Sequence, residues 1–499
     1  MSSLSLEPRE KLLRDCLADC AQSLHPLEIR FAGGWVRDKL LGIQSHDIDV
    51  ALSTLSGKDF GQTFLQFYNE HGEKYKKEAE RLGIDNTELN KIVLVEEDAE
   101  KSKHLAVAKL KLFCLEIDLV NLRTEVYASD SRTPVVKMGT AEEDALRRDA
   151  TINALFYNIH TEQVEDLTGK GLEDLKNKIM RTPLDPDQTF RDDPLRVLRL
   201  IRFASRLDFA IDAAAQTAMR SPEIHQALKL KISRERVRAE IVKALEGCRP
   251  TKALSHIHEL DLFNSCFADP ADPNPPSSQY LPQIYQSLSR ILENDFVCDN
   301  LQLRHESPAL PWLLAAYTPW ETSVCTEGSQ AMKNGMKAPA REAKLLEAAI
   351  QHRAAISALV SVVCRPNSPY TRGSIGMKLR SWGPTWGHQA LYALLCDLKT
   401  DPGAPLLYET FLRHLQRLNL DQSKAVDAKP ILDGRKIIHT LAPPKKLGPG
   451  IKFATDLVME WQFDNPEAGV AECEDMLRVR RDEVFRHDVE AREGARGRK

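Results

Sequence analysis

The chain has 499 residues, of which 42% are hydrophobic and 28% charged, values that are ordinary for a globular protein of several domains. Its net charge of −4 does not indicate a nucleic-acid binder as a whole, although basic residues cluster at 196–206, at 229–238 and beyond 478. No stretch approaches the roughly 20 consecutive apolar residues of a membrane span. The ten cysteines form no CxxC pair and no group at zinc spacing, which favours reduced thiols.

The N-terminal segment predicts a helix over 7–23. Acidic residues lie early in it, which argues against a mitochondrial transit peptide, and there is no apolar core for a secretory signal. We therefore expect an intracellular protein.

A glycine pair follows the first predicted strand. That strand covers 28–31 and leads into Gly33 and Gly34, after which a helix is expected from Trp35 to about Leu41. Glycines at such a turn let the backbone approach a phosphate, and the free N–H groups of the helix start attract an anion. Arg37 could add a charged contact. A tight turn alone would need the same glycines.

The alternating HDIDVAL at 46–52 predicts a strand with two acids on one face. Asp47 and Asp49 are two residues apart, so their side chains lie side by side. Such carboxylates repel each other unless cations lie between them, and Mg²⁺ prefers oxygen ligands of this kind. The alternative is an exposed strand with two solvated acids. A phosphate-holding turn followed by a metal-holding strand favours nucleotidyl transfer.

Two further strands are expected at 106–112 and 114–122, where polar and apolar residues alternate. Glu116 and Asp118 share one face of the second strand, and either could supply a third acid. An exposed strand face would have the same residues. The polar stretch 57–103 is mostly helical in pattern and has room for a loop that no residue in it identifies.

The segment RRDATINA at 147–154 is preceded by three acids, an order that complements a helix dipole. By itself it predicts a charged helix that packs its apolar residues inward: Leu146, Ile152, Ala154 and Leu155.

Beyond Pro194 the pattern becomes helical. Asp193 is a suitable N-cap with Pro194 at the first helical position, and it could pair with Arg196. Arg199, Arg202 and Arg206 fall within about a 60° sector of this helix, which requires an anion or acids opposite them. A carboxylate and a guanidinium together can also mimic a base edge.

The remaining 261–499 contain no acid/base or nucleophile pattern. The stretch 268–282 is rich in Pro, Asp and Ser and predicts a long loop. Gly448, Pro449 and Gly450 predict a turn, and the charged end at 490–499 predicts disorder.

Three of these motifs, GGWVRD with HDIDVAL, RRDATINA and DDPLR, occur in an order that resembles the class II tRNA nucleotidyltransferases of the DNA polymerase β superfamily. The resemblance covers roughly 28–245 and, more weakly, the tail. It implies an α/β nucleotidyltransferase head domain, polymerase β-like with a small mixed sheet and helices, followed by an elongated all-α neck, body and tail. We expect the head at 1–180, the neck at 181–265, and the tRNA-binding body and tail at 266–499.

The resemblance also implies the catalytic residues Asp47, Asp49 and Asp118. Spacing to the downstream arginine places Asp118, not Glu116, at the family's third acidic position. Two-metal catalysis would follow, with Mg²⁺ ions at Asp47 and Asp49: one activates the tRNA 3′-hydroxyl and the other holds the triphosphate.

The implied nucleotide site combines phosphate, ribose and base contacts. Arg148 would contact phosphate, and Asp149 with Asn153 would sense the 2′-hydroxyl. Asp193 and Arg196 would read the base within the EDxxR motif, where Asp192 replaces the family's glutamate. The expected nucleotide-binding residues are Gly33, Gly34, Arg37, Arg148, Asp149, Asn153, Asp193, Arg196, Arg199 and Arg202.

The function implied is template-independent addition of CCA, from CTP and ATP, to the 3′ end of tRNA, with the acceptor arm as the bound partner and no membrane. The alternatives are a poly(A) polymerase, an enzyme that adds only CC or only A, and a non-catalytic tRNA-binding protein. We expect the cytoplasm and nucleus, and a mitochondrial form if a longer isoform exists.

Overall fold

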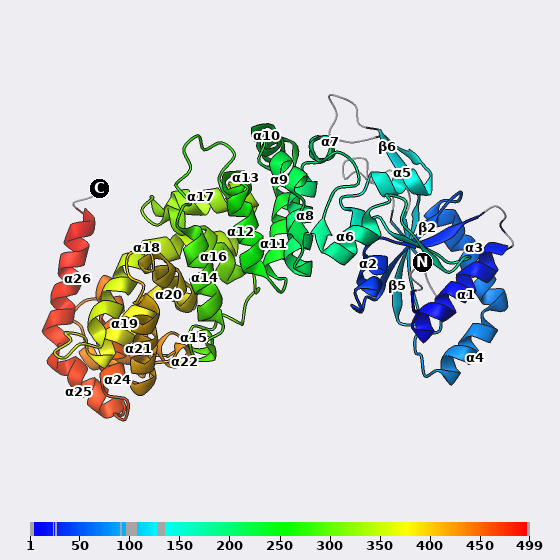
Figure 1. Cartoon of the computed structure of the whole chain (residues 1–499). Helices are drawn as coiled ribbons and strands as arrows, with labels where there is room; N and C mark the ends of the chain where they lie inside the picture. The colour runs from blue at the N-terminus through cyan, green and yellow to red at the C-terminus, as the bar shows by residue number, and fades with distance from the viewer. Residues whose placement is uncertain are drawn as a thin grey trace. The chain divides into compact units, whose positions relative to one another are not determined.

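The computed structural model describes residues 4–22, 24, 27–89, 92–95, 107–126 and 135–496. The chain divides into two compact units, Met1–Cys266 and Phe267–Lys499 (Figure 1). All described strands belong to the first unit, whereas the described elements within 268–496 are helices. The expected boundary at 180 falls inside the first unit and stays a prediction.

A seven-stranded mixed sheet forms the centre of the first unit, in the order β3-β4-β5-β2-β1-β8-β9. Strands β2 and β5 are parallel, and the other neighbours in this sheet are antiparallel. The central position of β2 and β5 places their side chains next to each other. The strands are β1 Ile29–Ala32, β2 Asp47–Leu52, β3 Val93–Val95, β4 Val107–Leu112, β5 Leu115–Asn121, β8 Phe156–Asn158 and β9 Gln163–Glu165.

Helices and two small sheets complete this unit. Helix α3 packs on β4 and β5, and α8 packs on α11 and α12. A small antiparallel sheet joins β6 Arg123–Val126 to β7 Val135–Met138. The helices are α1 Pro8–Gln22, α2 Gly34–Leu40, α3 Gly57–His71, α4 Glu73–Arg81, α5 Ala141–Leu146, α6 Gly171–Asn177, α7 Pro186–Asp192, α8 Leu195–Leu207, α9 Ala213–Met219, α10 Pro222–Lys231, α11 Arg234–Leu245 and α12 Pro250–Glu259.

A mixed α/β region followed by helices is the fold class that the sequence predicts, with one exception in the expected neck. Strand β11, Ala210–Ile211, pairs in parallel with β10, Ile179–Met180. The neck segment is therefore not entirely helical, because β11 in the neck pairs with β10 at the end of the expected head.

The predicted helix through RRDATINA is wrong. Helix α5 ends at Leu146, Ala150 is extended at φ −143° and ψ 146°, and a single 3₁₀ turn covers Thr151–Asn153. The three acids do lie in the first turn of α5, and the buried Asp144 also binds the side chains of Arg147 and Arg148. The four apolar residues still pack inward, although Leu146 is only half-buried.

The helix expected from Pro194 is present as α8, and a separate helix, α7, precedes it. Arg191 belongs to α7, and α8 begins only at Leu195. Asp193 lies between them, and its carboxylate accepts a hydrogen bond from the Leu195 N–H at 3.1 Å. The expected capping role of this side chain is confirmed.

The second unit begins with irregular chain at 268–280, as its composition predicts. Among the described helices only α18 is long and apolar enough to cross a membrane; one such helix is weak evidence, and α18 packs against α17, α20 and α21. The helices are α13 Phe263–Phe267 at the boundary, then α14 Leu281–Leu292, α15 Asp295–Asn300, α16 Leu310–Ala316, α17 Cys325–Met336, α18 Ala340–Val363, α19 Arg372–Trp382, α20 Trp386–Asp397, α21 Ala404–Arg417, α22 Gln422–Ala425, α23 Gly434–Leu441, α24 Pro449–Asp464, α25 Val470–Val479 and α26 Arg481–Arg496.

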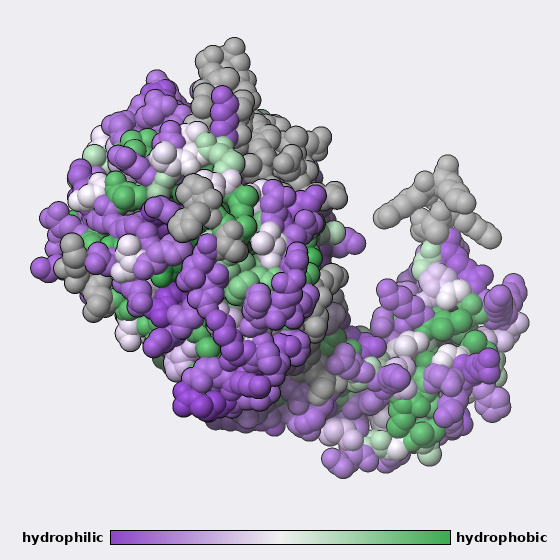
Figure 2. Space-filling view, turned by 90° about the vertical axis from the view of Figure 1, so that its right-hand side faces the viewer, coloured by the Kyte–Doolittle hydropathy of each residue, from purple (hydrophilic) through white to green (hydrophobic). Residues whose placement is uncertain are grey.

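The expected disorder at 490–499 is wrong as far as Arg496, where α26 ends. The helix is held by Asp488, whose carboxylate accepts hydrogen bonds from the N–H groups of Gly448 and Gly450 at 2.8 and 2.9 Å. Charge composition alone missed this tertiary contact. The described surface in the view of Figure 2 is mainly hydrophilic, with hydrophobic residues in smaller groups.

Candidate active site

The acids of β2 and β5 meet at the centre of the sheet. On β2, Ile48 and Val50 are buried, whereas Asp47 and Asp49 are exposed. The parallel register places Asp49 beside Asp118 and Asp47 beside Glu116. The three acids implied by the family resemblance are therefore on one face of two neighbouring strands.

The environment of Asp49 disfavours a negative charge. Burial raises the pKa of this carboxyl, and the nearby carboxylates of Asp118 and Asp47 raise it further. The cationic side chains of Arg148 and Lys109 lower the pKa but do not cancel the rise. The side chain nevertheless remains open to water on one side. Repulsion of this kind is relieved by a cation, and carboxylate oxygens suit a hard divalent ion.

Two lysines of β4 lie opposite the outer acids. In the antiparallel register Lys109 faces Asp118 and Lys111 faces Glu116, and each ammonium binds its acid. The described residues contain no group of three or more His, Cys, Asp or Glu side chains arranged to hold a metal. Asp47 and Asp49 supply two carboxylates that could hold a divalent cation, with further ligands coming from substrate oxygens.

The glycine turn touches this acidic face. Gly33 has a positive φ of 71°, and strand β1 pairs Ala32 with Asp49. A Cβ at Gly33 would lie 2.7 Å from the Arg148 Nη1 and 3.8 Å from the Asp49 Oδ2. Both the backbone conformation and the close approach therefore require glycine. Gly34 is the first residue of α2.

Arg148 is fixed beside the turn by several contacts. Its Nε and Nη2 donate to the Asp144 Oδ2 at 3.0 and 2.9 Å, and its Nη1 donates to the Asn153 backbone oxygen at 3.1 Å. The ring of Phe156 lies 5.1 Å from the guanidinium carbon. Burial alone would lower the pKa of Arg148, but Asp144 and Asp49 outweigh it and raise the pKa, so the residue is cationic.

Asp149 and Asn153 form the next part of the network. The Asn153 Nδ2 donates to the Asp149 Oδ1 at 2.9 Å, and the Arg199 Nε donates to the Asp149 Oδ2 at 2.7 Å. Burial by itself would raise the pKa of Asp149, but Arg199 and the Asn153 amide outweigh it and lower the pKa to about 2. Asp149 is therefore a buried, permanently charged anchor for Arg199.

Arg37 has a different position from the one expected. Its side chain is 2% exposed, its Nε donates to the Asp38 Oδ1 at 2.8 Å, and its Nη1 donates to the Asn153 Oδ1. In this arrangement Arg37 holds the Asn153 amide in place, and the expected phosphate contact stays a prediction.

The arginine row of α8 does have acids opposite it. Arg202 Nε donates to the Glu240 Oε2 at 2.6 Å, Arg199 Nη1 lies 3.7 Å from the Glu240 Oε1, and Arg206 lies 3.6 Å from Asp38. The buried ring of Phe203 is approached by the guanidinium carbons of Arg202, Arg37 and Arg199 at 4.1, 5.3 and 5.7 Å. These are cation–π distances.

Asp193 and Arg196, the pair expected to read the base, lie at the start of the same helix. Arg196 is 8% exposed, and its charge favours the ionised form of Asp149. The Asp193 Oδ2 lies 3.6 Å from the Arg236 Nη2 of α11. Asp193 and Arg196 are thus brought to the end of the network that reaches back to the acidic strands.

Comparison with known proteins agrees with this geometry. Residues 29–181 match the family model "Poly A polymerase head domain", and 208–271 match "Probable RNA and SrmB- binding site of polymerase A". The nucleotidyltransferase lcsQ of Purpureocillium lilacinum is 37% identical over 97% of this chain and 93% of its own. A mitochondrial CCA tRNA nucleotidyltransferase of Candida glabrata is 36% identical over 91% and 92%. The chain belongs to the CCA tRNA nucleotidyltransferase family.

A solved structure shares the fold of this CCA tRNA nucleotidyltransferase family member. The Thermotoga maritima CCA-adding enzyme complexed with tRNA superimposes with a TM-score of 0.64 at 18% identity, covering 95% of this chain and 96% of that one.

Several supporting residues of this family member were not found from the sequence. Asp144 lies three and four residues before Arg147 and Arg148, a helical pairing distance that could have indicated it. Glu240 lies 38 residues after Arg202, and no local pattern connects the two. Phe203 and Lys109 read as an ordinary core residue and an ordinary strand residue.

Proposed function

We propose that the chain adds two CMP and then one AMP, from CTP and ATP, to the 3′ end of tRNA without a nucleic-acid template. The observation that carries this proposal is the electrostatic interaction of Asp49 with Arg148, together with the hydrogen bonds that run from Arg148 through Asn153 and Asp149 to Arg199. It joins an acidic face suited to cations with cationic groups suited to a triphosphate, which is what nucleotidyl transfer needs.

The acids have separate roles in this proposal. Asp47 and Asp49 hold the divalent cations, here Mg²⁺, and Asp118 supports the reacting 3′-hydroxyl from the neighbouring strand. The bound ions supply Lewis-acid activation of the hydroxyl and charge neutralisation of the leaving pyrophosphate. Lys109 binds Asp118 and so positions its carboxylate before substrate enters.

The nucleotide is held by the glycine turn and the arginines. Gly33 and Gly34 let the triphosphate approach the backbone, Arg148 binds phosphate, and Asp149 with Asn153 senses the ribose hydroxyl. Arg199 and Arg202 neutralise the remaining charge, and Asp193 with Arg196 offers a donor and acceptor edge to cytosine or adenine. A half-buried carboxylate and a buried guanidinium can select a base in this way because wrong pairings leave polar groups unsatisfied.

The experiment is nucleotide incorporation into a tRNA transcript that lacks its 3′ CCA, with Mg²⁺ and CTP, ATP or both. Addition of two C residues and then one A, stopping there, supports the proposal. A stop after CC, or addition of A alone to a CC end, assigns a partial enzyme.

A second candidate is a poly(A) polymerase, because the matched head-domain model carries that description. Untemplated A tails on RNAs other than tRNA would support it. No incorporation despite tight tRNA binding would indicate a non-catalytic protein.

We also infer an intracellular location in the cytoplasm and nucleus, and a mitochondrial form arising from a longer isoform. The support for the mitochondrial form is that a similar protein of Candida glabrata is named mitochondrial. Localisation of tagged isoforms tests this inference.

A further inference from the structure

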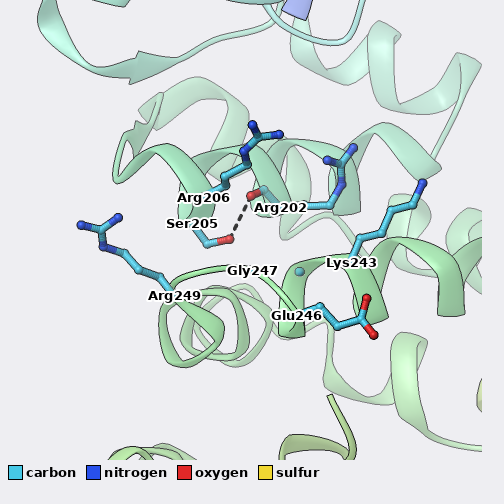
Figure 3. A pocket seen from close by; sticks show the side chains of 8 residues that line it. Arg202, Ser205, Arg206, Lys243, Glu246, Gly247 and Arg249 are labelled. Atoms are coloured by element: carbon cyan, nitrogen blue, oxygen red, sulfur yellow. Dashed lines mark hydrogen bonds between the residues drawn. The ribbon is translucent and has the colours of Figure 1, made fainter. Parts of the chain in front are cut away.

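A basic pocket of about 280 Å³ lies between α8 and the junction of α11 with α12. Figure 3 shows the side chains of Arg202, Arg206 and Lys243 extending on the same side, with Arg249 at the other end and Glu246 turned away. The lining thus has four cationic side chains and one carboxylate; Ser205, Ala244 and Gly247 complete it.

The cations of this pocket differ in how strongly they are already paired. Arg202 binds the buried Glu240 at 2.6 Å, so its position is fixed from behind. Arg206 and Arg249 have acids only at 3.6 and 3.5 Å, both through partly exposed side chains. Among the described residues no hydrogen bond or ion pair is formed by the exposed Lys243. Positive charge therefore remains available at the pocket mouth.

The composition of the lining favours a phosphate over a base. Like charges brought this close are stabilised by an anion. The described lining residues include no aromatic side chain on which a base could stack. A serine and a glycine keep one wall small, which leaves room for an anion and its water.

The pocket adjoins the proposed active site and shares Arg202 with it. Arg202 shares Glu240 with Arg199, which in turn binds Asp149. Lys243 and Arg249 take no part in that network and lie within the segment matched by the RNA-binding family model.

We propose that this pocket binds a backbone phosphate of the RNA strand whose 3′ end occupies the active site. The inference rests on the proposed function, because it makes the pocket part of the tRNA path. Lys243 and Arg249 do not belong to the arginines that we propose to bind the nucleotide triphosphate. We therefore favour a polynucleotide phosphate in this pocket over the triphosphate or free phosphate. Charge neutralisation by these two residues would anchor the strand and set its position.

The test measures equilibrium binding of a tRNA transcript without CCA, over about 50 to 200 mM KCl, by wild type, Lys243→Ala, Arg249→Ala and the double variant. We expect the double variant to bind tRNA about tenfold more weakly. The slope of log K against log salt should become shallower by about 0.7 to 0.9 for each phosphate that the variant no longer neutralises. CTP affinity, measured without RNA, should change less than about twofold.

Two charge controls sharpen this test. Lys77→Ala removes an exposed lysine of α4, at the other end of the first unit from α8 (Figure 1), and should change neither affinity nor slope. Glu246→Gln removes the pocket's carboxylate and should tighten tRNA binding. Unchanged melting temperatures exclude misfolding as the cause.

Each other result overturns the proposal. Unchanged tRNA affinity and slope in the double variant would remove the RNA strand from the pocket. Loss of CTP affinity equal to the loss of tRNA affinity would assign the pocket to the triphosphate. Binding of inorganic phosphate that is lost in the double variant, with tRNA binding intact, would assign it to a free anion. These readouts need no catalysis, so a failure of the proposed function is detected separately by the incorporation assay.

Discussion

The two halves of the proposed active site treat charge in opposite ways. On the neighbouring strands β2 and β5, Asp49 lies beside Asp118 and Asp47, and the charges of these two carboxylates oppose the ionisation of Asp49. On α8, in contrast, Arg199 and Arg202 each donate a hydrogen bond to a buried acid, Asp149 and Glu240 respectively.

The carboxylates of β2 and β5 carry charge that a ligand would neutralise, whereas the arginines of α8 carry charge that stabilises the fold. Binding of cations lowers the free energy of carboxylates that repel each other, so the acids of β2 and β5 favour metal binding. Arginines with fixed acid partners lose little side-chain entropy when a triphosphate arrives, because they are already ordered. The sheet side is therefore suited to bind cations, and the arginine side chains on the helix side are already ordered before a nucleotide binds.

The largest effect is expected from breaking the sheet side. Asp49→Asn removes a carboxylate from the cation site, so incorporation should fall by about a thousandfold or more while tRNA affinity stays within a few-fold. Single-turnover kinetics and a binding titration measure the two quantities. Glu116→Gln, a neighbouring acid already bound by Lys111, is the matched control and should lose far less. Wild-type rates in Asp49→Asn would contradict the assignment.

Removing the base-reading carboxylate should affect selection rather than chemistry. Asp193→Ala is expected to lower the discrimination between CTP and ATP by about tenfold to a hundredfold, since one buried hydrogen-bonding group is worth about 1 to 3 kcal/mol. Competing incorporation of the two nucleotides measures this. Asp187→Ala, an exposed acid of α7 paired with Arg191, is the control. Retained discrimination in Asp193→Ala would place base selection elsewhere.

The helix side can be tested through pH. Because the pKa of Asp149 is lowered to about 2, its charge stabilises the folded state above about pH 4, and this contribution is lost as the pH falls toward 2. Asp149→Asn should therefore cost about 2 kcal/mol at pH 7. The difference from wild type in the urea midpoint should shrink as the pH is lowered. A difference that does not depend on pH would show that the carboxylate's charge is not the cause.

The smallest effect is expected at Phe203, which three guanidiniums approach. Phe203→Leu removes the aromatic face, so the KM for both nucleotides should rise a few-fold at nearly constant kcat, as expected for contacts worth about 0.5 to 1 kcal/mol each. Phe203→Tyr should restore the wild-type KM. Phe64→Leu, at a buried aromatic residue of α3 that packs against the rings of Phe60 and Tyr68, serves as the stability control. An equal KM change in Phe64→Leu would point to general loosening.

The sequence predicted the strand-borne part of the site well because its information is local. A period of two places Asp47 and Asp49 together, and motif spacing selected Asp118 over Glu116. In the structure Asp118 lies directly beside Asp49, whereas Glu116 lies beside Asp47, and the choice between them stays a prediction. Strand pairing across many residues was needed to establish the register.

Long-range partners and end effects were not predictable in the same way. Nothing near Arg202 indicates Glu240, because the pair forms only when α8 packs on α11. The sequence predicts a continuous helix through RRDATINA because its residues permit one. The side-chain bonds of Asp144 and the extended Ala150 end that helix early.

The hydrogen bonds of Asp488 have a consequence for inheritance. A premature stop codon just upstream of this position would leave every acid and arginine of the proposed active site in the translated chain. It would nevertheless remove the acceptor for the buried Gly450 N–H and the Arg492 contact at 2.8 Å. A hydrogen bond to a charged carboxylate contributes about 1.5 to 3 kcal/mol, so its loss is enough to change the abundance of a marginally stable protein in a cell. Such an allele would present as a shortage of protein, with normal turnover in each molecule that survives.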